Sequence, residues 1–284
     1  MQQGGGILVV GADGMIGAAL AERFVNEGRR VVGTTHKGGP NSATFDLERD
    51  AATWPIPPNI AVAYLCAAVT STEDCRVRPD IARTLNVNRT VTLAYRLMHA
   101  GARVVFPSTN MVFDGSVPFQ RAEAATCPKT AYGRMKAEAE EQMIALGDHA
   151  CIVRLTKVIG PRMPLLVRWR ELLERQEPVH PFSDMVVAPI SLAHAIDALM
   201  HVGLGNSCGV FQASSTEDST YHEVALRLAE RLGANKKLIR PVSAAESHRR
   251  FEHLPKYTTL DTTRLRVEFG LVATDVMNSL EYAA

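Results

Sequence analysis

The chain has 284 residues, of which 46% are hydrophobic and 21% are charged, as in ordinary globular proteins and unlike collagen-like or disordered chains. Its 31 basic and 30 acidic side chains leave a net charge of +1, which gives no electrostatic reason to expect a nucleic acid or a membrane as a partner. The apolar runs are too short to span a membrane, and the N-terminal residues lack the pattern of a signal peptide. The five cysteines form no CxxC pair and the nine histidines show no metal-ligand spacing, so we expect no metal site and no disulfide framework.

The first 160 residues alternate short apolar runs with amphipathic helical stretches. Such alternation predicts right-handed βαβ units, and therefore a parallel sheet with helices on both faces. In chain order we expect strand Ile7–Val10, helix Gly14–Glu27, strands Val31–Thr35, Ala43–Phe45 and Val62–Ala67, helix Asp80–Ala100, strand Val104–Pro107, helix Tyr132–Leu146 and strand Cys151–Arg154.

Prolines interrupt the pattern after Gly160, where helices are expected at Leu165–Glu174, Leu192–Val202 and Tyr221–Leu232. We therefore expect residues 1–160 to form an α/β domain of the Rossmann type, with a doubly wound parallel sheet. Residues 161–284 are expected to form mainly a smaller lobe, with some segments returning to the first domain.

A glycine-rich turn joins the first predicted strand to the first predicted helix, with Gly11, Gly14 and Gly17 at GxxGxxG spacing. Glycine allows the tight turn, the close approach of a pyrophosphate and the packing of helix on strand, while the helix N-terminus supplies N–H donors. The motif predicts a dinucleotide site that uses Gly11, Gly14, Met15, Ile16 and Gly17, although turns that bind no ligand can have the same spacing.

The end of the second predicted strand favours NADP over NAD. An NAD site normally places an acid there, about 20 residues past the glycine loop, to bind the ribose 2′-hydroxyl. Thr35 occupies this place, about 18 residues beyond Gly17, and His36 and Lys37 follow it. A threonine hydroxyl can donate to a 2′-phosphate and the basic side chains supply positive charge, so we expect NADPH to be preferred over NADH. The alternative is a solvated basic turn, since Gly38-Gly39-Pro40 comes next.

Tyr132 and Lys136 stand four residues apart on a predicted helix, so they share one face. A nearby ammonium should lower the tyrosine pKa, ordinarily about 10, and make Tyr132 a usable general acid or base. Taken alone, such a spacing more often belongs to a surface pair without a catalytic role. The loop over residues 108–115 leaves the carboxyl end of the preceding strand, where open parallel sheets bind ligands, and together these features predict a catalytic site.

Three motifs carry a family resemblance: the GxxGxxG turn, the loop Ser108-Thr109-Asn110-Met111-Val112-Phe113-Asp114-Gly115, and Tyr132-Gly133-Arg134-Met135-Lys136. With them the chain resembles the extended short-chain dehydrogenase/reductase superfamily, and within it the dTDP-4-dehydrorhamnose reductase branch, which reduces nucleotide-linked 4-keto sugars. The likeness continues through Val153–Pro161, Ala188–Ile196 and Leu260–Leu265. It implies an NAD(P)-binding domain followed by a substrate-binding lobe.

The resemblance implies a role for individual residues. Thr109, three residues before Val112, matches the hydroxyl that holds the sugar carbonyl. Tyr132 matches the proton donor, and Lys136 matches the residue that binds the nicotinamide ribose and lowers the tyrosine pKa. Asn86 matches the asparagine of the family's Asn-Val motif, where a structural role and a catalytic role are both open. The implied cofactor contacts are Asp46 and Leu47 beside the adenine, and Cys66, Ala67 and Ala68 along the cofactor channel.

The chain departs from the family pattern at positions that would face the substrate. Asn110 and Met111 stand where the family's loop usually has Asp-Tyr, and Lys157 stands where it usually has a tryptophan. We expect these three residues to bind the substrate, and the departures leave the sugar less defined than the reaction.

The sequence therefore predicts a cytoplasmic, NADPH-dependent reductase of a nucleotide-activated keto sugar. The expected partner is that nucleotide sugar, with neither a nucleic acid nor a membrane, and a homodimer is compatible with this interpretation. Two alternatives stay open: a nucleotide-sugar epimerase on the same fold, and a non-catalytic NADP-binding regulatory subunit. A dehydratase is disfavoured because Asn110 and Met111 supply neither the acid nor the base that its chemistry needs. Intact Thr109, Tyr132 and Lys136 argue against the regulatory subunit.

Overall fold

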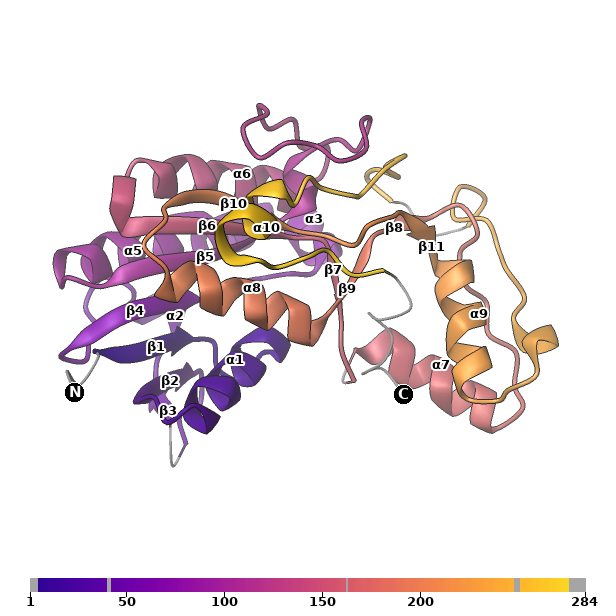
Figure 1. Cartoon of the computed structure of the whole chain (residues 1–284), viewed down its shortest axis with the longest axis horizontal. Coiled ribbons are helices and arrows are strands. Elements are labelled where there is room, and N and C mark those ends of the chain that lie inside the picture. The colour runs from indigo at the N-terminus through magenta and orange to yellow at the C-terminus, as the bar shows by residue number, and fades with distance from the viewer. Residues whose placement is uncertain (1–4, 40–41, 162, 248–250, 276–284) are drawn as a thin grey trace. The chain divides into compact units, whose positions relative to one another are not determined.

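The computed structural model describes residues 5–39, 42–161, 163–247 and 251–275 (Figure 1). The chain divides into two compact units, each assembled from three segments. The first unit comprises Met1–Val112, Ala125–Arg154 and Ile196–Phe211, and the second comprises Phe113–Ala124, Leu155–Ala195 and Gln212–Ala284.

A seven-stranded sheet of order β10-β6-β5-β4-β1-β2-β3 forms the centre of the first unit. The pairs β1–β2, β1–β4, β2–β3 and β4–β5 are parallel, and the predicted doubly wound α/β fold is confirmed. The strands are β1 (Gly6–Val10), β2 (Val31–Thr35), β3 (Ser42–Thr44), β4 (Ile60–Leu65), β5 (Arg103–Thr109), β6 (Ala150–Leu155) and β10 (Gly209–Ala213).

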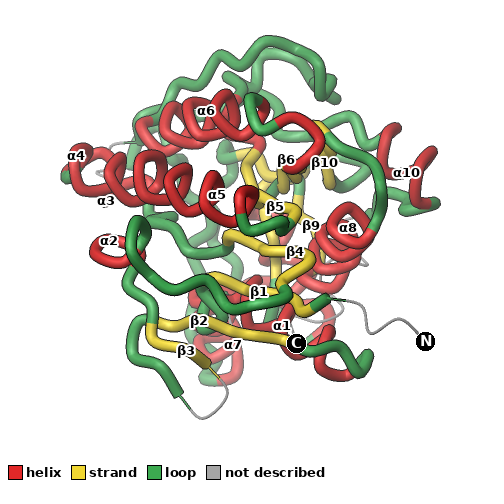
Figure 2. The backbone as a smooth tube through the Cα atoms, turned by 90° about the vertical axis from the view of Figure 1, so that its left-hand side faces the viewer, coloured by secondary structure: helices red, strands yellow, loops and turns green. Residues whose placement is uncertain are grey.

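Helices cover both faces of this sheet: α5 and α6 lie on one face, and α1 and α8 lie on the other (Figure 2). This arrangement is typical of right-handed βαβ crossovers. The helices are α1 (Met15–Asn26), α2 (Leu47–Asp50), α3 (Thr72–Val77), α4 (Pro79–Arg83), the π-helix η1 (Thr84–Arg89), α5 (Thr90–His99), the 3₁₀-helices η2 (Asn110–Val112) and η3 (Gly147–His149), α6 (Ala131–Ile144), and α8 (Leu192–Leu204) from residue 196 onward.

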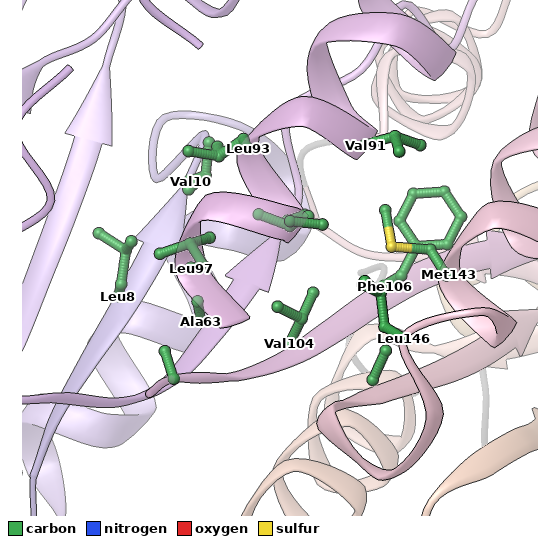
Figure 3. Close-up of a cluster of buried hydrophobic side chains, with 14 of the residues drawn as sticks. Leu8, Val10, Ala63, Val91, Leu93, Leu97, Val104, Phe106, Met143 and Leu146 are labelled. Carbon is green, nitrogen blue, oxygen red and sulfur yellow. The ribbon is translucent and has the colours of Figure 1, made fainter. Parts of the chain in front are cut away.

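The core of the first unit lies between the sheet and helices α5 and α6. Apolar side chains that alternate along the strands point to this face, where Phe106 of β5 lies beside Met143 of α6 (Figure 3). Burial of such side chains removes apolar surface from water and holds the strand ends, which carry the motifs, in place. The core includes Leu8, Val10, Ala63, Val91, Leu93, Leu97, Val104, Phe106, Met143 and Leu146 (Figure 3).

The second unit has its own hydrophobic core, formed mainly by α7 and α9, which lie side by side in Figure 1. A capping box, in which Thr220 and Glu223 each bond the other's backbone, begins α9. Strand β7 pairs with β9 in parallel, and β8 pairs with β11 in antiparallel orientation. The elements are β7 (Lys157–Ile159), α7 (Pro164–Glu174), β8 (Val186–Val187), β9 (Pro189–Ser191), β11 (Ser219–Thr220), α9 (Tyr221–Arg231), η4 (Lys236–Leu238) and α10 (Thr263–Phe269).

The helix expected over Asp80–Ala100 is not one uniform α-helix. It consists of α4, the π-helix η1 and α5, so its middle is wound more widely than its ends. Strand β10 was not expected, and it adds a seventh strand to the sheet beside β6. Across the described parts of the chain, no helix combines the length and the apolar character that a membrane crossing requires.

Candidate functional site

The glycine turn between β1 and α1 forms a tight cradle. Gly11 has a φ of +85°, and a Cβ there would lie 2.8 Å from the Ala67 backbone nitrogen. A Cβ on Gly17 would collide with the Gly11 carbonyl oxygen, so glycine is required for the helix to start this close to the strand. Gly14 precedes α1 and offers no side-chain cap, which leaves the first N–H groups, at Met15 and Ile16, available to an anion.

The end of β2 holds the glycine turn through backbone hydrogen bonds. The Thr34 carbonyl oxygen accepts hydrogen bonds from the N–H groups of Gly11 and Ala12, at 3.2 and 2.8 Å. The Thr35 hydroxyl is buried and has no hydrogen-bond partner among the described residues. His36 and Lys37 follow on an exposed loop, with the His36 side chain 68% exposed. The predicted 2′-phosphate residues therefore lie together beside the cradle.

Asp46 is a buried carboxylate that caps the short helix α2. It accepts hydrogen bonds from the Glu48 N–H at 3.0 Å and from Arg49 Nε at 2.6 Å, and His36 Nδ1 lies 3.9 Å from the same Oδ2 atom that Arg49 contacts. Burial favours the neutral acid, but these hydrogen bonds outweigh burial and lower the pKa of Asp46. Arg49, which the sequence analysis did not single out, thus lies close to His36. Leu47 is half-buried at the edge of the first core.

The exit of β4 lies against the glycine turn. The Cys66 N–H donates to the Val10 carbonyl oxygen at 2.9 Å, and burial raises the pKa of the Cys66 thiol to about 12. Ala67 is the residue that a Cβ on Gly11 would meet, and Ala68 is exposed. Cys66, Ala67 and Ala68 thus lie next to the cradle, on the side away from β2.

Asn86 has a clear structural contact. It is 2% exposed within the π-helix η1, and its amide both accepts from the Val69 N–H and donates to the Val69 carbonyl oxygen, at 2.8 Å each. The amide therefore holds the chain that leaves β4, as a backbone partner in a sheet would.

Thr109 is the last residue of β5 and is 8% exposed. Its hydroxyl accepts a hydrogen bond from the Met111 N–H at 3.2 Å and lies 3.4 Å from the Asn110 amide oxygen. The neighbouring Ser108 hydroxyl is buried and, within the described part of the chain, has no hydrogen-bond partner. A polar turn with an unused hydroxyl at the carboxyl end of a parallel strand is a suitable place for a ligand carbonyl.

The Thr109 loop lies directly on the first turn of α6. A Cβ on Gly133 would collide with the Met111 carbonyl oxygen, so Gly133 of the Tyr-Gly-Arg-Met-Lys motif permits this contact. The Thr130 hydroxyl caps the helix by accepting from the Gly133 N–H at 3.0 Å. The structure thereby brings together the predicted Thr109 and the helical turn that carries Tyr132.

Burial sets the charge state of Tyr132. The ring packs against a small cluster that includes Cys75, Val87 and Met135, and this burial raises the pKa of Tyr132, with a further contribution from Cys75. The expectation that Lys136 lowers the pKa of Tyr132 is therefore wrong for this structure, because burial dominates. Tyr132 keeps its proton at neutral pH.

Lys136 is buried, at 3% exposure, on the helix turn after Tyr132. Its ammonium donates to the Pro107 carbonyl oxygen at 2.6 Å and lies 3.6 Å from the centre of the Phe106 ring. Burial lowers the pKa of Lys136 to about 7, while Glu140 and Cys66 oppose this shift. Tyr132 and Lys136 are thus both fixed by contacts within the first unit: Tyr132 by the small apolar cluster, and Lys136 by Pro107 and Phe106.

A buried ion pair lies next to the Tyr-Gly-Arg-Met-Lys motif and was not predicted from the sequence. Arg154 of β6 contacts both carboxylate oxygens of Glu140 on α6, with Nη2 to Oε2 at 2.7 Å, and the two side chains are 3% and 2% exposed. Glu140 follows Lys136 by four residues, a spacing that the sequence does display. Nothing in the sequence indicates that Arg154 is its partner.

The predicted substrate residues are divided between the units. Asn110 and Met111 are half-buried in the first unit, whereas Lys157 is the exposed first residue of β7 in the second. Within the described ranges, no group of three His, Cys, Asp or Glu side chains is arranged to hold a metal ion.

Comparison with known proteins identifies the family. The family model described as RmlD substrate binding domain matches residues 5–283. A "dTDP-4-keto-6-deoxy-D-glucose reductase" of Streptomyces niveus is 30% identical over 259 residues, which cover 89% of this chain and 87% of the relative. A "dTDP-4-dehydrorhamnose reductase" of Mycolicibacterium smegmatis is 26% identical over 264 residues, which cover 91% of this chain and 78% of that protein.

The fold is shared with a solved structure as well. The crystal structure of dTDP-4-dehydrorhamnose reductase from Bacillus anthracis str. Ames, in complex with NADP, matches with a TM-score of 0.85 at 21% identity, over 98% of this chain and 97% of that one. The glycine cradle at the start of α1 is a suitable place for the pyrophosphate of a dinucleotide. The chain therefore belongs to the RmlD substrate binding domain family, a branch of the extended short-chain dehydrogenases/reductases, which are NAD(P)-dependent oxidoreductases.

Proposed function

We propose that this family member is an NADPH-dependent reductase of a nucleotide-activated keto sugar. The observation that carries the proposal is the contact of the Thr109 loop with the first turn of α6, which Gly133 permits. This contact places a hydroxyl at a strand end beside the turn that carries a protonated tyrosine. The names of the relatives from Streptomyces niveus and Mycolicibacterium smegmatis, both reductases of dTDP-linked sugars, support the substrate class.

In the proposed reaction, the Thr109 hydroxyl donates a hydrogen bond to the substrate carbonyl oxygen and fixes its position. Lys136 and the glycine cradle would hold a reduced nicotinamide cofactor, which would supply the hydride when bound. Tyr132 gives its proton to the oxygen as negative charge develops there. Because burial raises the pKa of Tyr132, the residue is a proton donor in its resting state, as a reduction requires.

The proposed cofactor site uses the cradle and its surroundings. Gly11, Gly14 and Gly17 with the N–H groups of Met15 and Ile16 would hold the pyrophosphate. Cys66, Ala67 and Ala68 would line the channel, Asp46 and Leu47 would lie beside the adenine, and Lys136 would bind the nicotinamide ribose.

Positive charge near the end of β2 supports a preference for NADPH. His36 and Lys37 are exposed after Thr35, and Arg49 lies on the same Asp46 oxygen that faces His36. Because Arg49 balances the Asp46 carboxylate, that acid does not oppose a 2′-phosphate strongly. We extend the proposed phosphate site to include Arg49.

The proposed substrate contacts are Asn110, Met111 and Lys157. Asn110 offers an amide that can both donate and accept, and Lys157 offers an exposed ammonium suited to a phosphate or a sugar hydroxyl. Each of these residues would influence which sugar or nucleotide is accepted, whereas Thr109 and Tyr132 would act on the carbonyl.

The test uses dTDP-4-keto-6-deoxy-D-glucose as the probe substrate and the absorbance of NADPH as the readout. The wild-type chain should oxidise one NADPH per sugar reduced. Tyr132→Phe should lower kcat by about 10²–10⁴-fold, the usual contribution of a general acid, and should leave the Kd for NADPH unchanged. Tyr95→Phe, a matched change at an exposed tyrosine on α5, should have no effect.

Three results would contradict the proposal. Isomerised sugar without net NADPH oxidation would indicate an epimerase. NADPH binding without turnover of any nucleotide keto sugar would favour a regulatory subunit. Turnover by Tyr132→Phe close to that of the wild type would remove Tyr132 from the reaction.

A further inference from the structure

The Glu140–Arg154 pair places two opposite charges in the interior of the first unit. The side chains are 2% and 3% exposed, and Arg154 Nε lies 3.1 Å from each carboxylate oxygen of Glu140. Bringing such charges out of water is costly, and well-packed apolar side chains often give equal or greater stability. We therefore look for a function of this pair beyond the contact it makes between α6 and β6.

Lys136 is the neighbour whose ammonium the negative charge of Glu140 would stabilise. It precedes Glu140 by one helical turn, and both side chains are buried on the side of α6 that faces the sheet. The contacts of the Lys136 ammonium described above, with the Pro107 carbonyl oxygen and the Phe106 ring, are with neutral groups. A buried lysine with neutral partners loses its proton readily, and burial here already lowers the pKa of Lys136 to about 7.

Other charged groups near α6 do not replace Glu140. The Cys66 thiol, whose pKa burial raises to about 12, is neutral at pH 7. The two acids on α3 are exposed to solvent, with the Glu73 side chain 63% and the Asp74 side chain 44% exposed. They form ion pairs with Arg76 and Arg78. Arginines on other elements that contact α6, namely Arg89 on η1, Arg96 on α5 and Arg103 on β5, would repel an ammonium. The other titratable side chains on α3 and α5 are Cys75, Tyr95 and His99.

We propose that Glu140, fixed and balanced by Arg154, is a positioning residue that keeps the buried Lys136 side chain in its ammonium form. The three side chains form a sequence of alternating charge, from Arg154 through Glu140 to Lys136. Arg154 has a specific part in it, because its guanidinium contacts both carboxylate oxygens of Glu140 and fixes that carboxylate one helical turn after Lys136. The importance of this charge for turnover rests on the proposed function, in which Lys136 binds the nicotinamide ribose.

The experiment measures the ionisation of Lys136 directly, without turnover. The full chain is labelled with ¹³C at lysine Cε, and the signal of each lysine is followed by NMR as the pH rises. The signal that disappears in Lys136→Arg belongs to Lys136. In the wild type it should titrate near pH 7, well below the ordinary lysine value of about 10.4.

Glu140→Gln should lower this midpoint by about one pH unit or more, the usual effect of removing a nearby opposite charge. Glu138→Gln is the matched control, because Glu138 lies on the same helix and pairs with Arg83 at the surface. It should leave the midpoint unchanged. If Glu140→Gln lowers the melting temperature but leaves the Lys136 midpoint where it was, the pair is purely structural and the proposal is wrong.

A second variant covers the case in which Glu140→Gln does not fold, since it leaves Arg154 unpaired. Glu140→Gln with Arg154→Met removes both charges, and the Lys136 midpoint should again fall below that of the wild type. A midpoint equal to or above the wild-type value would overturn the proposal.

A kinetic measurement separates this inference from the proposed function. As pH rises through its pKa, Lys136 loses the ammonium, so kcat/KM of the wild type should fall on the alkaline side. In Glu140→Gln this fall should begin at a lower pH. If the wild type reduces no keto sugar but the NMR midpoint shifts as expected, the proposed function fails and the charge relation stands. If activity is present and neither the midpoint nor the pH profile moves, the charge relation fails alone.

Discussion

Burial shifts the pKa values of Tyr132 and Lys136 in opposite directions. It disfavours the charged form of each group, so it raises the pKa of Tyr132 and lowers the pKa of Lys136 to about 7. At neutral pH the tyrosine therefore holds its proton while the lysine is close to its own titration. A site of this kind is ready to donate a proton to a carbonyl, and its response to pH should come first from the lysine.

Lys37 and Arg49 are expected to determine the choice between NADPH and NADH. We predict that the wild type prefers NADPH over NADH by at least about tenfold in kcat/KM, because charge-assisted contacts favour the 2′-phosphate. Lys37→Ala and Arg49→Ala should each reduce this preference by weakening the use of NADPH rather than by improving the use of NADH. Steady-state kinetics with both cofactors measures the effect.

The control for this prediction is Lys236→Ala, an exposed lysine of the second unit that pairs with Glu230. It should leave cofactor selectivity unchanged. Equal use of NADH and NADPH by the wild type would refute the prediction, as would unchanged selectivity in Lys37→Ala.

At the scale of elements, the β1–α1 turn depends on glycine to different degrees at its positions. A Cβ on Gly17 would collide with the Gly11 carbonyl oxygen, whereas a Cβ on Gly14 would meet that oxygen at an ordinary 3.5 Å. Gly17→Ala should therefore destabilise the cofactor-free protein by about 1–3 kcal/mol, the usual cost of overpacking. Gly14→Ala should cost less than about 1 kcal/mol, since only the helix cap is altered.

Urea unfolding of the two variants, without added cofactor, measures this difference. Equal loss of stability in both would show that the helix does not depend on the close approach of Gly17 to Gly11. A larger loss in Gly14→Ala would contradict the described geometry of the turn.

Several elements were predictable from the types of residue they contain, such as β-branched residues in a strand or Ala, Glu, Met and Lys in a helix. Val31–Thr35 has the predicted bounds in β2, and the predicted helix Tyr132–Leu146 corresponds to α6. Periodicity alone does not distinguish a π-turn from an α-turn, so η1 was read as part of one helix. Strand β10 was missed because Gly209–Ala213 begins with a glycine and the polar Gln212 interrupts its apolar residues, which gives little strand signal.

The candidate site was predictable where a motif lies within one local segment. The glycine turn, the Thr109 loop and the Tyr-x-x-x-Lys spacing are all visible in the sequence, and the structure places the last two in contact. The Glu140–Arg154 pair joins α6 to β6, and the link between Arg49, Asp46 and His36 joins α2 to the end of β2. Contacts between elements, and the burial that shifts a pKa, exist only once the chain has folded.

In the whole molecule, the proposed chemistry belongs to the first unit, and the proposed substrate contacts are divided: Asn110 and Met111 belong to the first unit and Lys157 to the second. Thr109, Tyr132 and Lys136 all belong to the first unit, which also carries the glycine cradle. Lys157 belongs to the second unit, which has a separate core. Substitutions at Asn110, Met111 or Lys157 should therefore alter which sugar is used, while substitutions at Tyr132 should alter the rate for every sugar.

The central claim is that the chain transfers a hydride to a sugar carbonyl and consumes the cofactor in doing so. The most direct measurement supplies NADPH that carries deuterium at the transferred position of nicotinamide C4, together with dTDP-4-keto-6-deoxy-D-glucose. We expect one deuterium at the former carbonyl carbon of the product for each NADPH oxidised. A product without deuterium, or a rearranged sugar formed with no net oxidation of NADPH, would contradict it.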